Sequence, residues 1–142
     1  MKNVTMRLLI VGILFSLLTA CAAHTPFQNI NPDEGKALVY VFRPNSPFAR
    51  GEMMEVEANG AKQDLLLNNA YIPVQVTPGA NTLKAQFKKR SLGKPTSMNL
   101  TTSAGETYYV KVEPGIAWTI KLSEIDPAQG AREISSKVLY QQ

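Results

Sequence analysis

The fold class is decided by residues 72–87, which read IPVQVTPGANTLKAQF. In both halves of this stretch apolar and polar side chains alternate, which is the pattern of strands with one buried face. Pro78 presets φ for a turn and Gly79 tolerates a positive φ, so a hairpin is predicted whose strands meet at this pair. Pro73 lacks the N–H group that a ladder needs, and its strand is therefore expected at a sheet edge or at a bulge.

Further strands are predicted on both sides of this stretch. Residues 36–43 (KALVYVFR) are almost all apolar, as in a central strand that is covered on both faces. Residues 52–59 alternate and end in Asn59-Gly60, the strongest short hairpin signal, so a return strand is expected over residues 62–67. Three more strands are predicted over residues 96–103, 107–113 and 116–122, with Trp118 among the inward-facing side chains of the last one.

These segments predict an all-β protein, an antiparallel β-sandwich of about seven or eight strands with a short C-terminal helix. The helix is expected after Asp126, which suits the N-cap position, because Pro127 favours the first turn and Gln129 follows three residues after the cap. Gly130 weakens that helix. The sandwich and its helix are together assigned residues 36–142.

The order of strands and turns resembles a bacterial family, the domain of unknown function 2846. The shared features are residues 36–44 (KALVYVFRP), the Asn59-Gly60 turn, and the runs NAY at 69–71, PGANTL at 78–83 and AGETYYV at 104–110. From the Asn59-Gly60 turn through residue 87, the chain is also similar to the β-modules called PEGA domains. Asn81 stands where the family pattern has His more often. The resemblance implies a β-domain to which no activity is assigned.

The first 20 residues predict an export signal. Lys2 and Arg7 precede an apolar run that begins at Leu8, which is the layout of a signal peptide. Residues 8–20 would span only about 20 Å as a helix, against about 30 Å of hydrocarbon in a bilayer. A lasting transmembrane helix is therefore not expected.

The signal ends in residues 18–21, Leu-Thr-Ala-Cys, which resemble the lipobox of bacterial lipoproteins. The resemblance implies that Cys21 receives a lipid, that the chain is cut before it, and that acyl chains such as palmitate then anchor the protein to a membrane. Ala22 and Ala23 imply the outer membrane of a Gram-negative host, on the side that faces the periplasm. The alternative is an ordinary cleavage site beside a chance cysteine.

Charge and residue content narrow the function classes. The formal net charge of +4 falls to +2 when Lys2 and Arg7 leave with the signal, so nucleic acid is not an expected partner. His24, the one histidine, lies in residues 21–35, which lack apolar periodicity and are predicted to form a flexible tether. Because Cys21 is the one cysteine and is expected to carry lipid, we expect no nucleophile–histidine device, no metal site and no cofactor.

A group of basic residues is the main candidate for a binding surface. Lys84 on a strand and the loop residues Lys88, Lys89, Arg90 and Lys94 predict a positive tip that could contact an anionic envelope polymer or lipid phosphate. The alternative is a solubilising loop that protects an edge strand.

Two smaller groups have alternatives of their own. Glu55 and Glu57 lie two residues apart and therefore share one strand face. They are either functional, as an acid/base pair or as calcium ligands, or simply part of a strand face exposed to solvent. Tyr109 and Lys111 form either a binding platform or the packing surface for a second sheet. The expected function is a non-catalytic envelope lipoprotein, held to a membrane by its lipid, that binds or scaffolds an envelope protein or polymer. A lipid-anchored envelope enzyme with an unrecognised loop site is the alternative.

Overall fold

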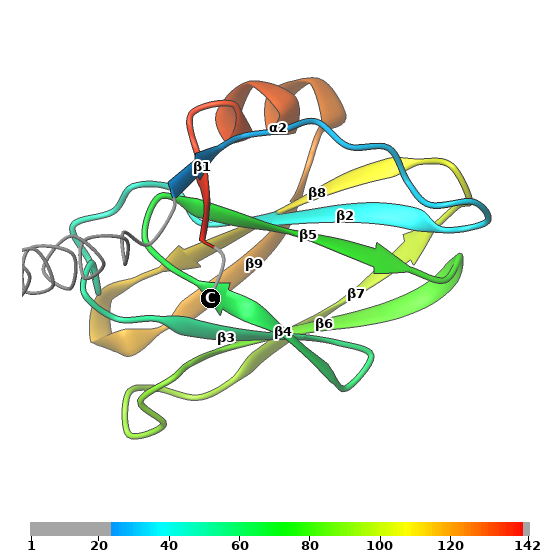
Figure 1. The fold of residues 1–142 in the computed structure, drawn as a ribbon. Coiled ribbons are helices and arrows are strands. Elements are labelled where there is room, and N and C mark those ends of the chain that lie inside the picture. Colours follow the sequence, from blue (N-terminus) through cyan, green and yellow to red (C-terminus); the bar gives the residue numbers. More distant parts are fainter. Residues whose placement is uncertain (1–23, 141–142) are drawn as a thin grey trace, which may run out of the picture.

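Two sheets form the body of the protein, and a computed structural model describes it over residues 24–140 (Figure 1). The strand order is β1-β10-β5-β2-β8-β9 in the six-stranded sheet and β4-β3-β6-β7 in the four-stranded sheet. The elements are β1 (His24–Pro26), β2 (Ala37–Phe42), β3 (Met54–Ala58), β4 (Ala61–Leu66), β5 (Ala70–Val76), β6 (Gly79–Phe87), β7 (Thr96–Thr102), β8 (Thr107–Pro114), the 3-10 helix η1 (Ile116–Trp118), β9 (Ile120–Ile125), α2 (Pro127–Ile134) and β10 (Val138–Tyr140).

The predicted all-β fold with a short C-terminal helix is confirmed, although the described residues form ten strands where seven or eight were predicted. The two additional strands, β1 and β10, have three residues each and pair with one another. A strand of three residues is too short to show an alternating pattern, which explains why the sequence did not predict them.

β2 lies inside the six-stranded sheet and is buried along its whole length, as its apolar run predicts. Val39 and Val41 face the core between the sheets, while Tyr40 and Phe42 belong to a second apolar cluster on the outer face. β2 pairs antiparallel with β5 but parallel with β8, and β10 is parallel to β5. The sheet is therefore mixed, which corrects the expectation of a wholly antiparallel sandwich.

The stretch 72–87 forms two strands as predicted, but they do not form a hairpin. β5 pairs with β2 in the six-stranded sheet, whereas β6 pairs with β3 and β7 in the four-stranded sheet. The Pro78-Gly79 turn, with a φ of 113° at Gly79, carries the chain from one sheet to the other. A turn signal predicts that the chain reverses, and it does not specify which sheet the next strand joins.

The Asn59-Gly60 turn does join a hairpin, because β3 and β4 pair antiparallel on either side of it. Both turn residues have positive φ, 51° and 81°. Pro73 is accommodated without a bulge. The amide of Arg43 donates to the carbonyl of Ala70, and hydrogen-bonded and non-hydrogen-bonded pairs alternate along an antiparallel ladder, so Pro73 stands in a non-hydrogen-bonded pair with Tyr40 and needs no N–H toward β2. On the other side of β5, β10 pairs only with residues 70 and 71 and does not reach Pro73.

The segment before β2 packs on the outer face of the six-stranded sheet, where a free tether was expected. The ring of Phe27 lies edge-on to Tyr40 and Tyr71, with centroid distances of 5.4 and 5.2 Å. The Tyr40 hydroxyl accepts a hydrogen bond from the amide of Ile30 (2.9 Å), and the Tyr71 hydroxyl accepts one from the amide of Gln28 (3.1 Å). One aromatic residue and several backbone groups hold this segment, and none of them produces a periodic signal in the sequence.

Helix α2 covers the rest of that outer face (Figure 1). Its predicted cap is confirmed, because the Asp126 carboxylate accepts hydrogen bonds from the amides of Ala128 and Gln129 at 3.0 and 3.1 Å. Among residues 24–140, no helix has the length and apolar content that crossing a bilayer requires.

Gly130 lets α2 lie directly on Tyr109, since a Cβ atom at this position would be 2.3 Å from Cγ of that ring. The ring stacks on Tyr40 at 5.6 Å and has little room to retreat.

We expect Gly130→Ala to lower the free energy of unfolding by about 1–3 kcal/mol through overpacking, even though alanine is the better helix former by about 1 kcal/mol. Urea denaturation measures this. Ala131→Gly, exposed on the same helix, is the control for propensity alone, and a Gly130→Ala variant as stable as the parent chain would contradict the close contact.

Candidate functional site

Three loops meet at one end of the sandwich, and we call this the loop end: residues 43–53 after β2, 88–95 after β6 and 115–119 after β8 (Figure 1). β2 and β8 are parallel neighbours, so the chain leaves both strands at the same end of the six-stranded sheet. In the other sheet, the last residue of β6 pairs with the first residue of β3, which brings the 88–95 loop beside the 43–53 loop.

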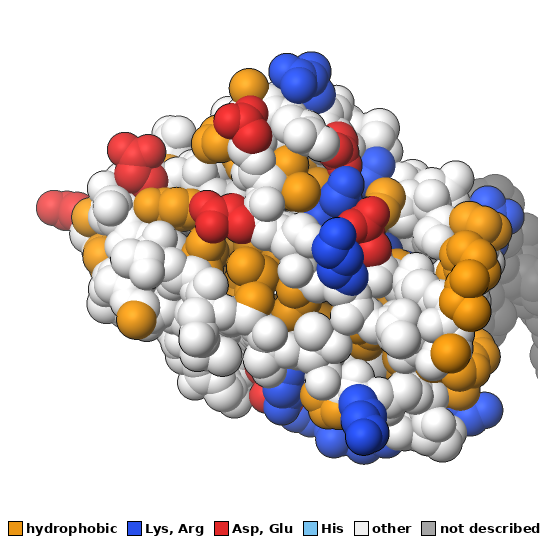
Figure 2. All heavy atoms as spheres, turned by 180° about the vertical axis from the view of Figure 1, so that it is seen from behind, with side chains coloured by type: hydrophobic (Ala, Val, Ile, Leu, Met, Phe, Trp, Pro, Cys, Tyr) orange, Lys and Arg blue, Asp and Glu red, His pale blue; other side chains and the backbone are white. Residues whose placement is uncertain are grey.

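Large apolar side chains are exposed at the loop end. The exposed fractions are 49% for Phe48, 76% for Ile116 and 42% for Trp118. Figure 2 shows hydrophobic side chains gathered along this end, at the right of the view. Phe48 and the 115–118 segment line a hollow of about 210 Å³, and a second hollow of about 320 Å³ lies between Trp118 and Lys94. A cluster of exposed apolar side chains with polar neighbours is typical of an interaction surface.

Trp118 was predicted to face the core, and the structure shows this to be wrong. Residues 116–118 form the 3-10 helix η1 instead of the start of a strand, and β9 begins at Ile120, which is buried. Ala117 and Trp118 have φ angles of 57° and 58°, so the period-two pattern is interrupted there. The Trp118 ring contacts Phe87 edge-on at 5.7 Å, and the residue is 42% exposed.

The backbone of the loop end is strained at three residues of two loops. Ala49, Ala117 and Trp118 all have φ between 51° and 58°, which residues with a Cβ rarely adopt unless their surroundings impose it. The 88–95 loop contributes to this, because Gly93 lies against the Trp118 backbone so closely that a Cβ would be 2.0 Å from the Trp118 carbonyl oxygen. The exposed apolar side chains therefore stand on loops that are held in shape.

Arg43 fixes the 43–53 loop from beneath, and sequence reasoning missed it. It is fully buried, and its guanidinium donates hydrogen bonds to the backbone carbonyls of Glu52 (2.7 Å), Phe48 (3.4 Å) and Ala49. Burial lowers the pKa of this guanidinium, with the nearby Glu52 carboxylate acting in the opposite direction. The one available signal was an arginine that directly continues a wholly apolar strand.

The predicted basic tip is partly neutralised by the two glutamates of β3. Lys84 forms an ion pair with Glu57, and Arg90 forms one with Glu55 at 3.1 Å. A hydrogen bond from Gln86 is the main reason that the pKa of Glu55 is lowered, and nearby cations contribute. Glu55 and Glu57 thus already have cationic partners, which favours the solvated-face alternative over an acid/base pair.

Lys88, Lys89 and Lys94 remain without an ion-pair partner among the described residues, and all three are exposed on the 88–95 loop. Of the three, Lys94 lines the hollow beside Trp118. Within residues 24–140, no cluster of three or more His, Cys, Asp or Glu side chains is placed to hold a metal ion.

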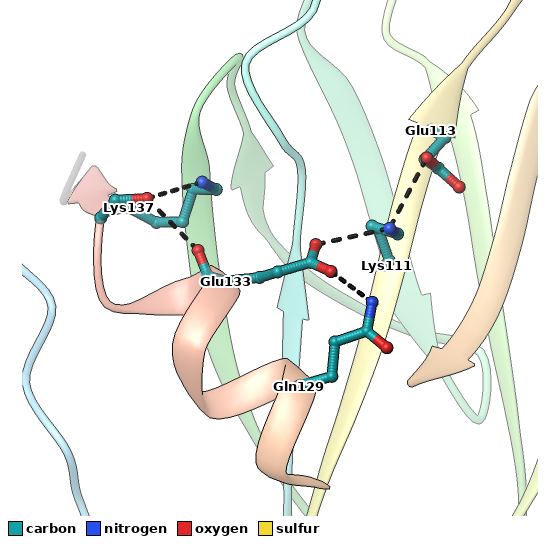
Figure 3. Close-up of polar contacts among 6 residues, drawn as sticks. Lys111, Glu113, Gln129, Glu133 and Lys137 are labelled. Carbon is teal, nitrogen blue, oxygen red and sulfur yellow. Dashed lines mark hydrogen bonds and ion pairs between the residues drawn. The ribbon is translucent and has the colours of Figure 1, made fainter. Parts of the chain in front are cut away.

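Tyr109 and Lys111 do not form an open platform, because α2 lies directly on the Tyr109 ring. Figure 3 shows the side chains of the same helix beside Lys111. Tyr109 is buried against the helix, and burial raises its pKa. Lys111 pairs with Glu133 of α2 at 3.4 Å, and a hydrogen bond from Gln129 lowers the pKa of that glutamate. The packing alternative is correct, although the covering element is a helix and not a second sheet.

Cys21 and the export signal lie outside the described residues, so lipidation stays a prediction. His24 is the first described residue, and its backbone pairs with that of Tyr140 in the β1–β10 ladder.

The fold and the site define a small two-sheet β-sandwich with an apolar loop end bordered by cations. The chain belongs to the DUF2846 family, described as proteins of unknown function, whose model matches residues 33–119. That span contains all three loops of the loop end and confirms the resemblance seen in the sequence. No curated protein matches the chain.

Proposed function

We propose that this protein is a non-catalytic lipoprotein of the bacterial envelope, and that its sandwich is a binding or scaffolding module. The loop end is its contact surface. The observation that carries the proposal is the exposure of Phe48, Ile116 and Trp118 together on one end of the domain. Exposed apolar area costs about 25 cal/mol per Å² relative to burial, so such a cluster stabilises a contact when a partner covers it.

The held backbone beneath these side chains supports the same conclusion. A loose loop could turn its apolar side chains inward, whereas Arg43 fixes the 43–53 loop and Gly93 lies closely against Trp118. A surface that is already ordered loses less conformational entropy when it binds. Lys88, Lys89 and Lys94, which have no ion-pair partner within residues 24–140, favour a partner with anionic groups, such as an envelope polymer or lipid phosphate.

Anchoring rests on the Leu-Thr-Ala-Cys sequence at residues 18–21, and we propose the outer membrane, facing the periplasm. In a Gram-negative host fed a tagged fatty acid, the full chain is expected to carry label and to fractionate with outer-membrane markers. Cys21→Ser is expected to abolish labelling, because lipid transfer needs the thiol as nucleophile. Label on the Cys21→Ser variant would refute lipidation at this residue, and a labelled chain found with inner-membrane markers would refute the sorting.

A further inference from the structure

The described domain begins at the same end of the sheet as the loop end. Thr25 of β1 pairs with Leu139 of β10, which pairs with Tyr71 of β5, which pairs with Phe42 at the end of β2. β1 therefore lies level with the point where the 43–53 loop leaves the sheet, and Figure 1 shows both on the left of the view. Only Ala22 and Ala23 separate Cys21 from His24, and the three steps from one Cα atom to the next reach at most about 11 Å.

This short distance is a consequence of how residues 27–35 pack. Had they formed a free tether, the domain could stand well clear of the membrane. Instead, Phe27 packs between Tyr40 and Tyr71, and Asp33 and the carbonyl of Asn31 hydrogen-bond to Gln75. The chain runs along the outer face of the sheet, and its length does not extend the reach of the anchor.

We propose that the loop end is a membrane seat: Phe48, Ile116 and Trp118 enter the interfacial layer of the bilayer that holds the Cys21 lipid. Lys88, Lys89 and Lys94 contact the phosphates of its headgroups. The inference rests on the proposed lipidation at Cys21 and assigns the partner of the loop end. A folded protein partner does not fit this geometry, because a connection of about 11 Å leaves no room for a second domain between the loop end and the membrane.

The chemistry of the three side chains suits this partner. Tryptophan prefers the membrane interface, since its indole has an apolar body and an N–H group that can stay hydrated. Phenylalanine and isoleucine contribute further apolar area, since Phe48 and Ile116 line the same hollow as Trp118. Lysine has a long apolar stem, so its ammonium group reaches phosphates while the stem lies against the apolar surface. Loop 88–95 supplies these cations, and Lys94 lies directly beside the hollow at Trp118.

Trp118 is the one tryptophan of the chain, so its fluorescence reports on the loop end without background. The lipidated full chain, purified from membranes, is reconstituted into vesicles of phosphatidylethanolamine and phosphatidylglycerol. The reference is the chain without lipid in detergent-free buffer. Relative to it, we expect the Trp118 emission of the reconstituted chain to lie at shorter wavelength and to be quenched several-fold less by iodide. We also expect strong quenching of Trp118 by lipids that are spin-labelled near the headgroup. The matched control combines Trp118→Phe with Ala104→Trp, which moves the tryptophan to an exposed turn after β7, and no lipid quenching is expected there.

Replacing the three lysines together, Lys88→Gln, Lys89→Gln and Lys94→Gln, tests the cationic contact. Lipid quenching of Trp118 is expected to fall on the anionic vesicles, and 1 M salt is expected to have the same effect on the unmodified chain, because it shortens the Debye length to about 3 Å. Equal quenching in all these conditions would overturn the phosphate contact.

The outcomes separate the seat from the anchor. If the chain carries lipid and floats with the vesicles, but Trp118 and the Ala104→Trp control are quenched equally by iodide and not by labelled lipid, the seat is overturned and the anchor stands. If Trp118 is shielded from iodide without any lipid quenching, a protein surface covers the loop end and the seat is likewise overturned. A chain that carries no lipid and stays with the soluble fraction refutes the anchoring itself.

Discussion

The variant Arg43→Met is expected to have a free energy of unfolding about 3 kcal/mol lower than that of the parent chain, because a buried backbone acceptor left without a donor costs about 1–3 kcal/mol. The carbonyls of Phe48, Ala49 and Glu52 lose the Arg43 donor, although that of Ala49 keeps a hydrogen bond from the backbone amide of Glu52 at 3.0 Å. Methionine fills much of the volume and removes the burial penalty of the cation, which offsets part of the loss. Replacing a buried charge can be neutral when its partners are replaced too, but here the carbonyls belong to the backbone and remain.

Denaturation in urea measures this change, and limited proteolysis of the 43–53 loop reports whether the loop loosens. Arg50→Met is the matched control, since Arg50 lies on the same loop, is exposed, and makes one side-chain hydrogen bond, to Asn45 at 3.3 Å. Its effect should stay within about 0.5 kcal/mol. Arg43→Lys should be intermediate, because one ammonium group cannot match the fork that reaches three carbonyls. If Arg43→Met and Arg50→Met are equally stable, Arg43 does not hold the loop.

Much of the fold could be predicted from local pattern, because alternation along 72–87 and the apolar run of β2 depend only on which faces are buried. The pairing of strands could not. β5 and β6 join different sheets because their inner faces oppose each other across the core, and a turn of two residues serves a hairpin and a sheet crossing alike. The Asn59-Gly60 turn did predict a true hairpin, since both residues adopt the positive φ that matches the strand twist.

The candidate site was predicted only in its charged part. Lys88, Lys89 and Lys94 lie within seven residues of the sequence, 88–94, and can be seen as a group without the fold. Phe48 and Ile116 are far apart in the sequence, and they come together in space because the parallel strands β2 and β8 end side by side. Trp118 shared its spacing with the inward residues of β9, and only the strained backbone of η1 turns it outward. Exposed apolar residues in loops carry no periodicity, so sequence alone does not separate them from core residues.

Asn81 is the second position where we expect a large effect, and the sequence marked it only as a departure from the family pattern. It is 3% exposed and lies at the end of the sandwich opposite the loop end. The two N–H groups of its side-chain amide are shared among the carbonyls of Thr77 and Gly79 and the Thr102 hydroxyl, each 3.0 Å from the nitrogen, and its oxygen accepts from the side-chain amide of Asn59 at 2.7 Å. One side chain therefore joins the β3–β4 turn, the β5–β6 crossing and the end of β7.

Asn81→Leu keeps the volume and removes every one of these bonds, so we expect the free energy of unfolding to fall by about 3 kcal/mol. The control is Asn99→Leu on β7, which is exposed, accepts one hydrogen bond from Thr82, and should change stability by less than about 0.5 kcal/mol. Equal changes in the free energy of unfolding for Asn81→Leu and Asn99→Leu would show that the hydrogen bonds of Asn81 do not stabilise the fold.

Asn81→Asp separates the donors from the acceptor, because the carboxylate can still accept from Asn59 but cannot donate to Thr77 or Gly79. Burial beside carbonyl oxygens should raise the pKa of the introduced carboxyl above its unfolded value of about 3.9. The folded state then binds a proton more tightly than the unfolded state, so the destabilisation is complete above the folded pKa and shrinks as pH falls through it. Urea denaturation of both chains at pH 7 and pH 4.5 should show a smaller difference at the lower pH. A difference that does not change with pH would mean that the donors to Thr77 and Gly79 do not stabilise this end of the sandwich.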